Sequence, residues 1–283
     1  MVGPMGRPFQ MIDVFGSDAF SGNPVAVVHD AEGMATDEMM AITRWMNLSE
    51  TTFIFPPTSS EADYRVRIFT LRGELPFAGH PTLGTCHAWL SAGGRPAGEI
   101  VVQECGIGLV PLRRDELLSF VAPPLIRSGP VEEAFVEQVA AVLGVGTSRI
   151  VEAEWVDNGP GWVGILLEDR DSVLALEPDI GRYGGPEQLD IGVVAPHPDG
   201  SDVDFEVRAF FADDRGQLVE DPVTGSLNAS LAQWLIGSGR APDSYVAAQG
   251  TAIGREGRIH ITRDGSGVWV GGSTVTHVWG EVG

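Results

Sequence analysis

Residues 74–83 read ELPFAGHPTL, and residues 220–229 read EDPVTGSLNA. These stretches open two longer segments, 74–108 and 220–254, which align without a gap at a constant offset of 146 residues. Eight of the 35 aligned pairs are identical, whereas ordinary composition gives about two identities by chance. The period is far too long for a solenoid. The sequence therefore predicts two similar domains, which could place different groups on the two sides of one cleft.

Each copy of the repeat predicts a helix that is buried on all sides. No charged residue occurs between Pro81 and Ala92 or between Leu227 and Ile236, and a helix that is apolar around its whole circumference must be buried. His80 and Ser226 stand where N-caps are expected, and glycines follow both helices. Short strands flank each helix. The pattern predicts two β-rich barrels or sandwiches, each wrapped around its own central helix.

Prolines between Phe120 and Pro130 mark the expected linker. We expect an N-terminal domain over 1–122 and a C-terminal domain over 123–270, with the active site between them. The strands at the end of the chain could close either domain, and we assign 271–283 to the first. Alternation and turn signals predict further elements: strands over 11–15, 23–29, 51–55, 64–71, 99–103, 245–249, 268–270 and 274–279, and helices over 36–47 and 131–143.

Composition excludes several classes of function. The net charge of −21 argues against nucleic acid and anionic membranes as partners. All 18 basic residues are arginine, so no lysine amine is present for a Schiff base or a lysine-bearing phosphate loop. The two cysteines have no metal-ligand spacing, and His80 and His87 lack a third ligand. We expect no cofactor and no metal.

No signal peptide is expected, because residues 1–10 lack a basic start followed by an apolar run. No apolar stretch approaches the length of about 18 residues that a membrane span requires. A reducing cytoplasm is the expected location.

The starts of the two buried helices are candidate binding sites. A helix N-terminus carries unpaired N–H donors and attracts carboxylate or phosphate, and Gly79 and Gly225 would let a ligand approach closely. A cleft between the copies would receive His80 from one side and Asp221 with Ser226 from the other. Such a set can transfer protons. His80 could equally be a cap and Asp221 a turn residue, but their parallel positions favour function.

Glu50 is a third candidate. It stands between a loop and an apolar strand, and partial burial there would raise its pKa toward that of a general base; a solvated surface glutamate is the alternative. Glu74 and Glu220 are interpreted as structural because both copies retain them. Cys86 lies in an uncharged helix and is expected to be an inert buried thiol.

The sequence resembles the PhzF-type, phenazine biosynthesis-like family within the diaminopimelate epimerase-like fold. The matching stretches are Asp13-Val14-Phe15 with Gly22-Asn23-Pro24, Asn47-Leu48-Ser49-Glu50-Thr51, Glu74 to Pro81, Glu220 to Ser226, and Gln249-Gly250 with Gly254-Arg255. The resemblance implies an α+β fold of two pseudo-symmetric halves, each a barrel-like, mostly antiparallel sheet around a central helix, and commonly a homodimer without a cofactor.

The same resemblance assigns roles to individual residues. It implies that Glu50 is the catalytic acid/base and that His80 and Asp221 assist proton transfer or hold the substrate. Substrate contacts are implied for four further positions: Ser49, Gly79, Gly225 and Ser226.

Related epimerases and proline racemases place two cysteines where this chain has Ala78 and Thr224. Two-base racemisation through thiolates is therefore not expected. A single carboxylate suits double-bond migration on a small anionic metabolite, plausible in secondary metabolism, and this is the predicted function. The alternatives are an amino-acid epimerase or dehydratase using Glu50 with Asp221 or His80, and a binding protein without catalysis.

Overall fold

The computed structural model describes residues 6–183, 189–212 and 217–283, and the fold is α+β, as the sequence predicts. The chain divides into two compact units. Unit 1 comprises Met1–Val121 and Gly271–Gly283, and unit 2 comprises Ala122–Val270. In the described ranges, no helix has both the length and the apolar character of a membrane span.

Unit 1 is one curved sheet with the spatial order β18-β1-β2-β3-β4-β6-β7-β8 and with β5 beside β4. The β2–β3 and β4–β6 pairs are parallel, and the other pairs are antiparallel. α1 (Thr36–Met46) connects β2 to β3, and α2 (Gly79–Ser91) connects β5 to β6. The strands are β1 (Arg7–Val14), β2 (Asn23–Val28), β3 (Glu50–Phe55), β4 (Tyr64–Phe69), β5 (Glu74–Leu75), β6 (Val101–Cys105), β7 (Gly108–Arg114), β8 (Leu118–Val121) and β18 (Thr274–Val282).

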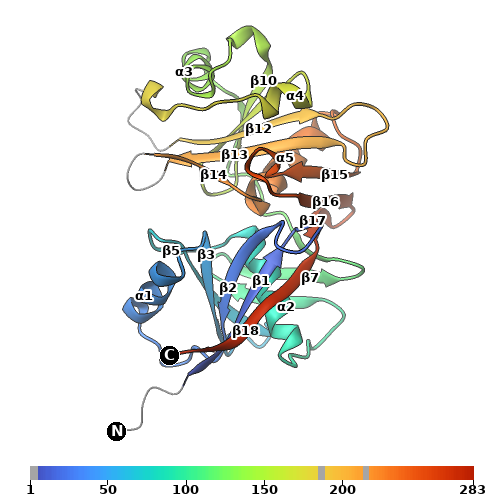
Figure 1. The fold of residues 1–283 in the computed structure, drawn as a ribbon. Helices are drawn as coiled ribbons and strands as arrows, with labels where there is room; N and C mark the ends of the chain where they lie inside the picture. The colour runs from blue at the N-terminus through green and yellow to red at the C-terminus, as the bar shows by residue number, and fades with distance from the viewer. Residues whose placement is uncertain (1–5, 184–188, 213–216) are drawn as a thin grey trace. The chain divides into compact units, whose positions relative to one another are not determined.

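The C-terminal strand belongs to unit 1. β18 runs antiparallel along β1, with Arg7 opposite Val282 and Val14 opposite Thr274. Figure 1 shows this red strand beside the blue N-terminal strands. The last residues of the chain thus complete the sheet that the first ones begin.

Unit 2 repeats this connectivity, with the order β9-β10-β11-β12-β13-β15-β16 and with β14 beside β13. Its parallel pairs are β11–β12 and β13–β15. The strands are β9 (Arg127–Pro130), β10 (Ile150–Asp157), β11 (Trp162–Leu167), β12 (Asp190–Pro196), β13 (Phe205–Ala212), β14 (Leu218–Asp221), β15 (Ser244–Gln249), β16 (Gly257–Asp264) and β17 (Gly267–Gly272). The helices are α3 (Glu133–Leu143), α4 (Arg170–Leu174) and α5 (Gly225–Gly237), with 3-10 turns η1 (Thr147–Arg149), η2 (Ile180–Arg182) and η3 (Thr251–Ile253).

The two repeat glutamates occupy equivalent positions in the sheets of the two units. Glu74 pairs with Phe69, and Glu220 pairs with Phe210. In each unit the arginine two residues earlier on that strand binds the glutamate through two hydrogen bonds: Arg67 in unit 1 and Arg208 in unit 2. These pairs agree with the structural role predicted for both glutamates.

The central helices are buried, as their lack of charge predicts. α2 is buried from Gly79 through Cys86, and α5 is buried over most of its length. α2 contacts strands β1, β2, β3, β6, β8 and β18 of its own unit. In Figure 1, α2 lies among the strands of unit 1 and α5 among those of unit 2.

The predicted cap roles of His80 and Ser226 are wrong by two residues, because the N-caps are Ala78 and Thr224. α2 begins at Gly79 and α5 at Gly225, because the extended residues before them are Ala78 (φ −153°, ψ 142°) and Thr224 (φ −112°, ψ 98°). Neither makes a side-chain cap bond. His80 and Ser226 are therefore second residues of their helices, and their side chains contact neighbouring strands instead.

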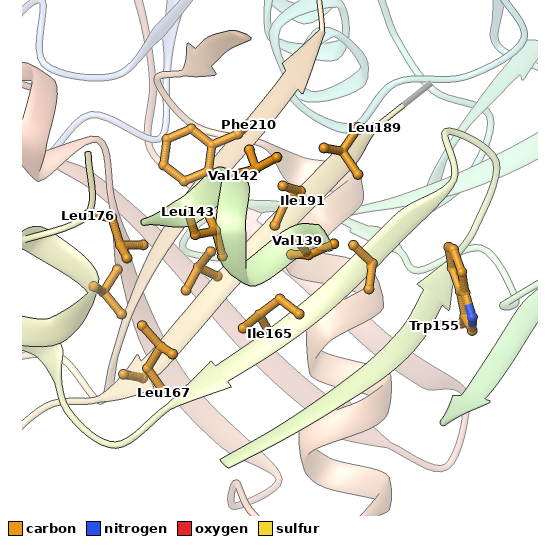
Figure 2. Close-up of a cluster of buried hydrophobic side chains, with 14 residues drawn as sticks. Val139, Val142, Leu143, Trp155, Ile165, Leu167, Leu176, Leu189, Ile191 and Phe210 are labelled. Atoms are coloured by element: carbon orange, nitrogen blue, oxygen red, sulfur yellow. The ribbon is translucent and has the colours of Figure 1, made fainter. Parts of the chain in front are cut away.

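Each sheet carries a second helix on its other face. In unit 1, Met39 and Met40 of α1 join Phe9, Phe53 and Phe69 in a buried apolar cluster. In unit 2, α3 packs Val139, Val142 and Leu143 against strand residues such as Ile165 and Phe210 (Figure 2). Each sheet is thus covered on both faces, which fixes the strands that carry the candidate site.

Candidate active site

Glu50 and His80 form the centre of the predicted site within unit 1. Oε2 of Glu50 lies 3.3 Å from Nε2 of His80, and their side chains are 15% and 4% exposed. Glu50 is the first residue of β3, and His80 is the second residue of α2. The loop-to-strand boundary and the helix start, predicted separately from the sequence, meet here.

The register between the inner helix and the sheet brings these residues together. Thr85 of α2 donates a hydrogen bond to Thr52 of β3 over 2.8 Å. Since alternate strand residues share a face, Glu50 lies on the same α2-facing side as Thr52, two residues nearer the start of the strand. That step carries the Glu50 carboxylate to the N-terminal end of the helix, where His80 lies.

Asn23 is the second polar neighbour of His80. It is the first residue of β2, is fully buried, and places Nδ2 3.4 Å from Nδ1 of the imidazole. Asn23 lies within the Gly-Asn-Pro stretch that carried the family resemblance, but its contact with His80 was not predicted from the sequence.

Burial sets the protonation state of His80. His80 as a whole is 3% exposed, and removal from water lowers the pKa of its imidazole to about 3, because desolvation penalises the charged form. His80 is therefore neutral at physiological pH, and its 3.3 Å approach to Glu50 is a contact between a neutral imidazole and a carboxyl group rather than an ion pair.

The remaining predicted residues of unit 1 lie at the same end of α2. Gly79 is the buried first residue of the helix, and Ser49 immediately precedes β3. No acidic residue occurs in the first turn of α2. The positive end of this helix dipole is thus available to an anion close to Glu50.

In unit 2, the loop before α5 is held by a buried hydrogen-bond network. The Thr224 hydroxyl donates to Oδ2 of Asp221 over 2.6 Å and accepts from Nε2 of Gln249 over 2.9 Å. Oε1 of Gln249 accepts from the Thr224 backbone N–H at 3.0 Å and from Asn228 at 2.8 Å. The network fixes Asp221, which is 8% exposed, against the start of α5.

Ser226 is also held by its own unit. Its hydroxyl accepts from the Trp162 indole N–H at 3.3 Å, and its carbonyl accepts from the Asn158 side chain at 2.9 Å. Gly225 is buried as the first residue of α5. Unit 2 therefore presents Asp221, Gly225 and Ser226 around one helix N-terminus, as unit 1 presents Glu50, Gly79 and His80 around another.

A buried glutamine supports the same helix position in both units. Gln103 donates to Thr82 of α2 over 3.0 Å, and Gln249 accepts from Asn228 of α5. Both glutamines are identical in the two copies of the repeat, and both are fully buried. The sequence repeat already pairs Gln103 with Gln249, and the structure shows that each glutamine is hydrogen-bonded near the start of its helix.

The described residues contain no group of three or more His, Cys, Asp or Glu side chains placed to hold a metal ion. Cys86 is fully buried, and burial raises the pKa of its thiol to about 12. The predicted burial of Cys86 is confirmed, and its lack of reactivity stays a prediction.

Comparison with known proteins agrees with this fold. The model of the family described as phenazine biosynthesis-like protein, PhzC-PhzF, matches residues 12–280. The chain therefore belongs to the phenazine biosynthesis-like family.

Similar proteins cover nearly the whole chain. A protein of Schizosaccharomyces pombe named antisense-enhancing sequence 1 is 35% identical, and the alignment covers 96% of this chain and 97% of that one. A trans-2,3-dihydro-3-hydroxyanthranilate isomerase of Pseudomonas aeruginosa is 33% identical over 92% of this chain and 91% of its own. The crystal structure of a PhzF family protein from Enterococcus faecalis superposes with a TM-score of 0.79 at 26% identity, covering 98% and 99% of the two chains.

Proposed function

We propose that this protein is a cofactor-independent isomerase that moves a proton, and with it a double bond, on a small carboxylate-bearing metabolite. The observation that carries the proposal is the contact between the Glu50 carboxylate and the neutral His80 imidazole at the N-terminus of α2. The isomerases among its relatives support the reaction class.

In the proposed reaction, Glu50 is the general base. Its carboxylate takes a proton from a carbon next to a double bond, and the electron pair of that C–H bond delocalises over the allylic system. The acidic proton on Glu50 exchanges with solvent, and the carboxyl group then delivers a proton to the far end of that system on the same face. The formula of the substrate is unchanged, and no electrons leave it.

His80 and the start of α2 assist this transfer. Because His80 is neutral, it does not compete with the carboxylate as an acid, and its Nε2 lies 3.3 Å from Oε2 of Glu50. The backbone N–H groups that begin the helix stabilise negative charge that develops on the substrate; removing one such donor typically costs about 10²–10³ in rate.

Asp221, Gly225 and Ser226 are proposed to engage the same substrate molecule, together with Ser49 and Gly79. The helix that begins at Gly225 supplies a second set of N–H donors for a carboxylate. The Asp221 carboxylate, held by Thr224, suits an amino or hydroxyl group on the substrate. We propose a homodimer in the cytoplasm as the working form, from the family resemblance.

Ala78 and Thr224 favour proton return to one face. Racemisation by two thiolate bases needs a cysteine at each of these positions, and the Thr224 hydroxyl instead donates to Asp221. A methyl group and an engaged hydroxyl cannot act as bases, which supports isomerisation over racemisation.

The test uses trans-2,3-dihydro-3-hydroxyanthranilate in D₂O with the whole chain. We expect turnover to a constitutional isomer that carries one solvent deuterium at the newly protonated carbon, read by NMR and mass spectrometry. Glu50→Gln should lower kcat by about 10²–10⁴, the usual contribution of a positioned acid/base. The exposed Glu61 supplies a matched control, because Glu61→Gln removes the same charge outside the site.

Undiminished turnover by Glu50→Gln would remove Glu50 from the reaction. Loss of optical activity with unchanged constitution would identify an epimerase instead. Saturable binding without deuterium exchange for this and related cyclic or amino carboxylates would identify a binding protein.

A further inference from the structure

The side chain of Asn23 stands on the far side of the His80 imidazole from Glu50. Its Nδ2 is 3.4 Å from Nδ1, while Glu50 Oε2 is 3.3 Å from Nε2. The three residues therefore form a chain of contacts, from the carboxamide through both ring nitrogens to the carboxylate. Asn23 is fully buried and His80 is 3% exposed, so bulk water does not replace these contacts.

Packing between β2 and α2 holds this chain in register. Val25 lies two residues after Asn23, on the same face of β2, and its side chain packs directly against Gly84, one helical turn after His80. Two strand residues advance about 6.6 Å, and four helical residues advance about 6 Å. The contact at Val25 thus places Asn23 opposite His80.

The chemistry of the amide selects one form of the ring. An amide nitrogen donates hydrogen bonds and does not accept them, so Nδ1 facing it must be the bare, accepting nitrogen. A neutral imidazole carries a single proton, which therefore resides on Nε2. Nε2 is the ring nitrogen that lies 3.3 Å from Oε2 of Glu50, so this tautomer puts the proton on the side of the ring nearest the carboxylate.

We propose that Asn23 is a positioning residue that holds His80 in its Nε2-protonated tautomer, so that His80 donates to Glu50 and keeps this carboxylate in its basic form. The proposal rests on the proposed function for its effect on rate, but the tautomer itself does not depend on any substrate. With the other tautomer, the Nδ1 proton would face the amide protons of Asn23, and a bare Nε2 would face the carboxylate. A buried donor would then face another donor at Nδ1, and a buried acceptor would face another acceptor at Nε2, which is unfavourable at both nitrogens.

The direct test is ¹⁵N NMR of the whole chain labelled at histidine, without substrate. The His80 signals are assigned by comparison with His80→Gln, and the shifts and two-bond couplings identify the protonated nitrogen. We expect His80 to be neutral with its proton on Nε2 between pH 5 and 8. A proton on Nδ1, or an imidazolium at pH 7, would overturn the proposal.

Two substitutions at Asn23 separate positioning from packing. Asn23→Asp keeps the shape but replaces the donor with an acceptor, so the ring proton should move to Nδ1. Asn23→Leu removes the amide donor and with it the preference for the Nε2-protonated tautomer, so both tautomers of His80 should appear. We expect kcat to fall by about 10²–10⁴ in Asn23→Asp, since wrong-tautomer variants of comparable dyads lose up to about 10⁴, while KM changes little. The acid limb of the kcat/KM profile should also move.

A second amide–imidazole contact supplies the matched control. Gln10 Nε2 lies 3.3 Å from His29 Nε2 in the same unit, away from Glu50. Gln10→Glu makes the same amide-to-carboxylate change and should leave the His80 tautomer and the rate unchanged. An equal effect of Gln10→Glu on the His80 spectrum would contradict a specific role for Asn23.

The outcomes distinguish this proposal from the function it rests on. If Asn23→Asp does not fold, the wild-type spectrum and Asn23→Leu still decide the tautomer. An Nε2 proton in wild type that persists in folded Asn23→Leu would overturn the role of Asn23, whatever the enzyme catalyses. If no isomerase activity is found, the tautomer shift in the variants still supports the positioning role.

Discussion

Gly84 of α2 lies directly against Val25 of β2. A Cβ atom placed on Gly84 would stand 2.3 Å from Cγ1 of Val25 and 3.1 Å from Cγ2 of Val14. This close approach seats the buried helix on the sheet one turn after His80. The distance between the helix and β2 therefore controls the geometry of the candidate site.

Gly84→Ala should destabilise the protein by about 1–3 kcal/mol, the usual cost of overpacking a core. It should also reduce turnover, because separating α2 from β2 moves His80 relative to Asn23 and Glu50. Urea unfolding and the isomerase assay measure the two effects.

A second helical glycine provides the control for this substitution. Gly237 ends α5 and would place a Cβ within 4 Å of nothing, so Gly237→Ala should be neutral or stabilising by up to about 1 kcal/mol. Pairing Gly84→Ala with Val25→Ala should recover part of the lost turnover. Equal destabilisation by both glycine substitutions would show that helix propensity, not the contact with Val25, determines the effect.

The buried His80 should make stability depend on pH. Its pKa is about 3 in the folded chain, against 6.5 as the ordinary value, because burial disfavours the cation. Between these values the unfolded chain binds a proton that the folded chain does not, so the free energy of unfolding falls as the pH falls. The stabilisation is fully present above pH 6.5 and is lost progressively toward pH 3.

Comparison with His80→Gln isolates this contribution. From pH 8 to pH 5, wild type should lose about 2 kcal/mol more than the variant, at about 1.4 kcal/mol per pH unit below 6.5. The pKa values of His29, His87 and His260 are also lowered by burial, but they contribute to both proteins. Parallel stability curves for the two proteins would mean that His80 titrates normally.

The Arg208–Glu220 pair should contribute more to stability than its counterpart Arg67–Glu74. The side chains of Arg208 and Glu220 are 6% and 10% exposed, whereas those of Arg67 and Glu74 are 25% and 40% exposed. Arg208 also donates to two carbonyl groups at α4.

Glu220→Gln should therefore cost about 3 kcal/mol, because it leaves a buried charge without its partner. Glu74→Gln should cost no more than about 1 kcal/mol. Chemical unfolding of the two variants checks the difference, and similar costs would show that burial does not separate the two pairs.

The sequence predicts those features of the fold that depend on residues within each copy of the repeat. Uncharged helices between glycines predict the buried α2 and α5, and the identical glutamates predict one structural role in both units. The helices begin two residues earlier than predicted, because the last extended residues are Ala78 and Thr224. Neither side chain makes a capping hydrogen bond that the sequence could have indicated.

The site was predicted less completely because its contacts join distant strands. Glu50 and His80 were each predicted, but the contact between them requires the register of β3 against α2. Asn23 is 57 residues from His80, and only the parallel pairing of β2 with β3 brings it to the same helix end. Periodicity reveals which face of a strand is buried, but not which residue on that face opposes a given helical turn.

The last prediction concerns the thiols. Burial raises the pKa of Cys86 to about 12 and also raises that of Cys105, which is partly exposed. At pH 7.5, iodoacetamide should leave Cys86 unlabelled in the folded protein and alkylate Cys105 slowly, because the thiolate is the reactive form. In urea, both cysteines should react.

The double variant Cys86→Ala, Cys105→Ser should lose about 1 kcal/mol of stability from the small cavity at Cys86 but retain its turnover, since Glu50 and not a thiolate moves the proton. A folded double variant without turnover would show that a cysteine thiol takes part in the reaction and would contradict the role of Glu50 as the sole base.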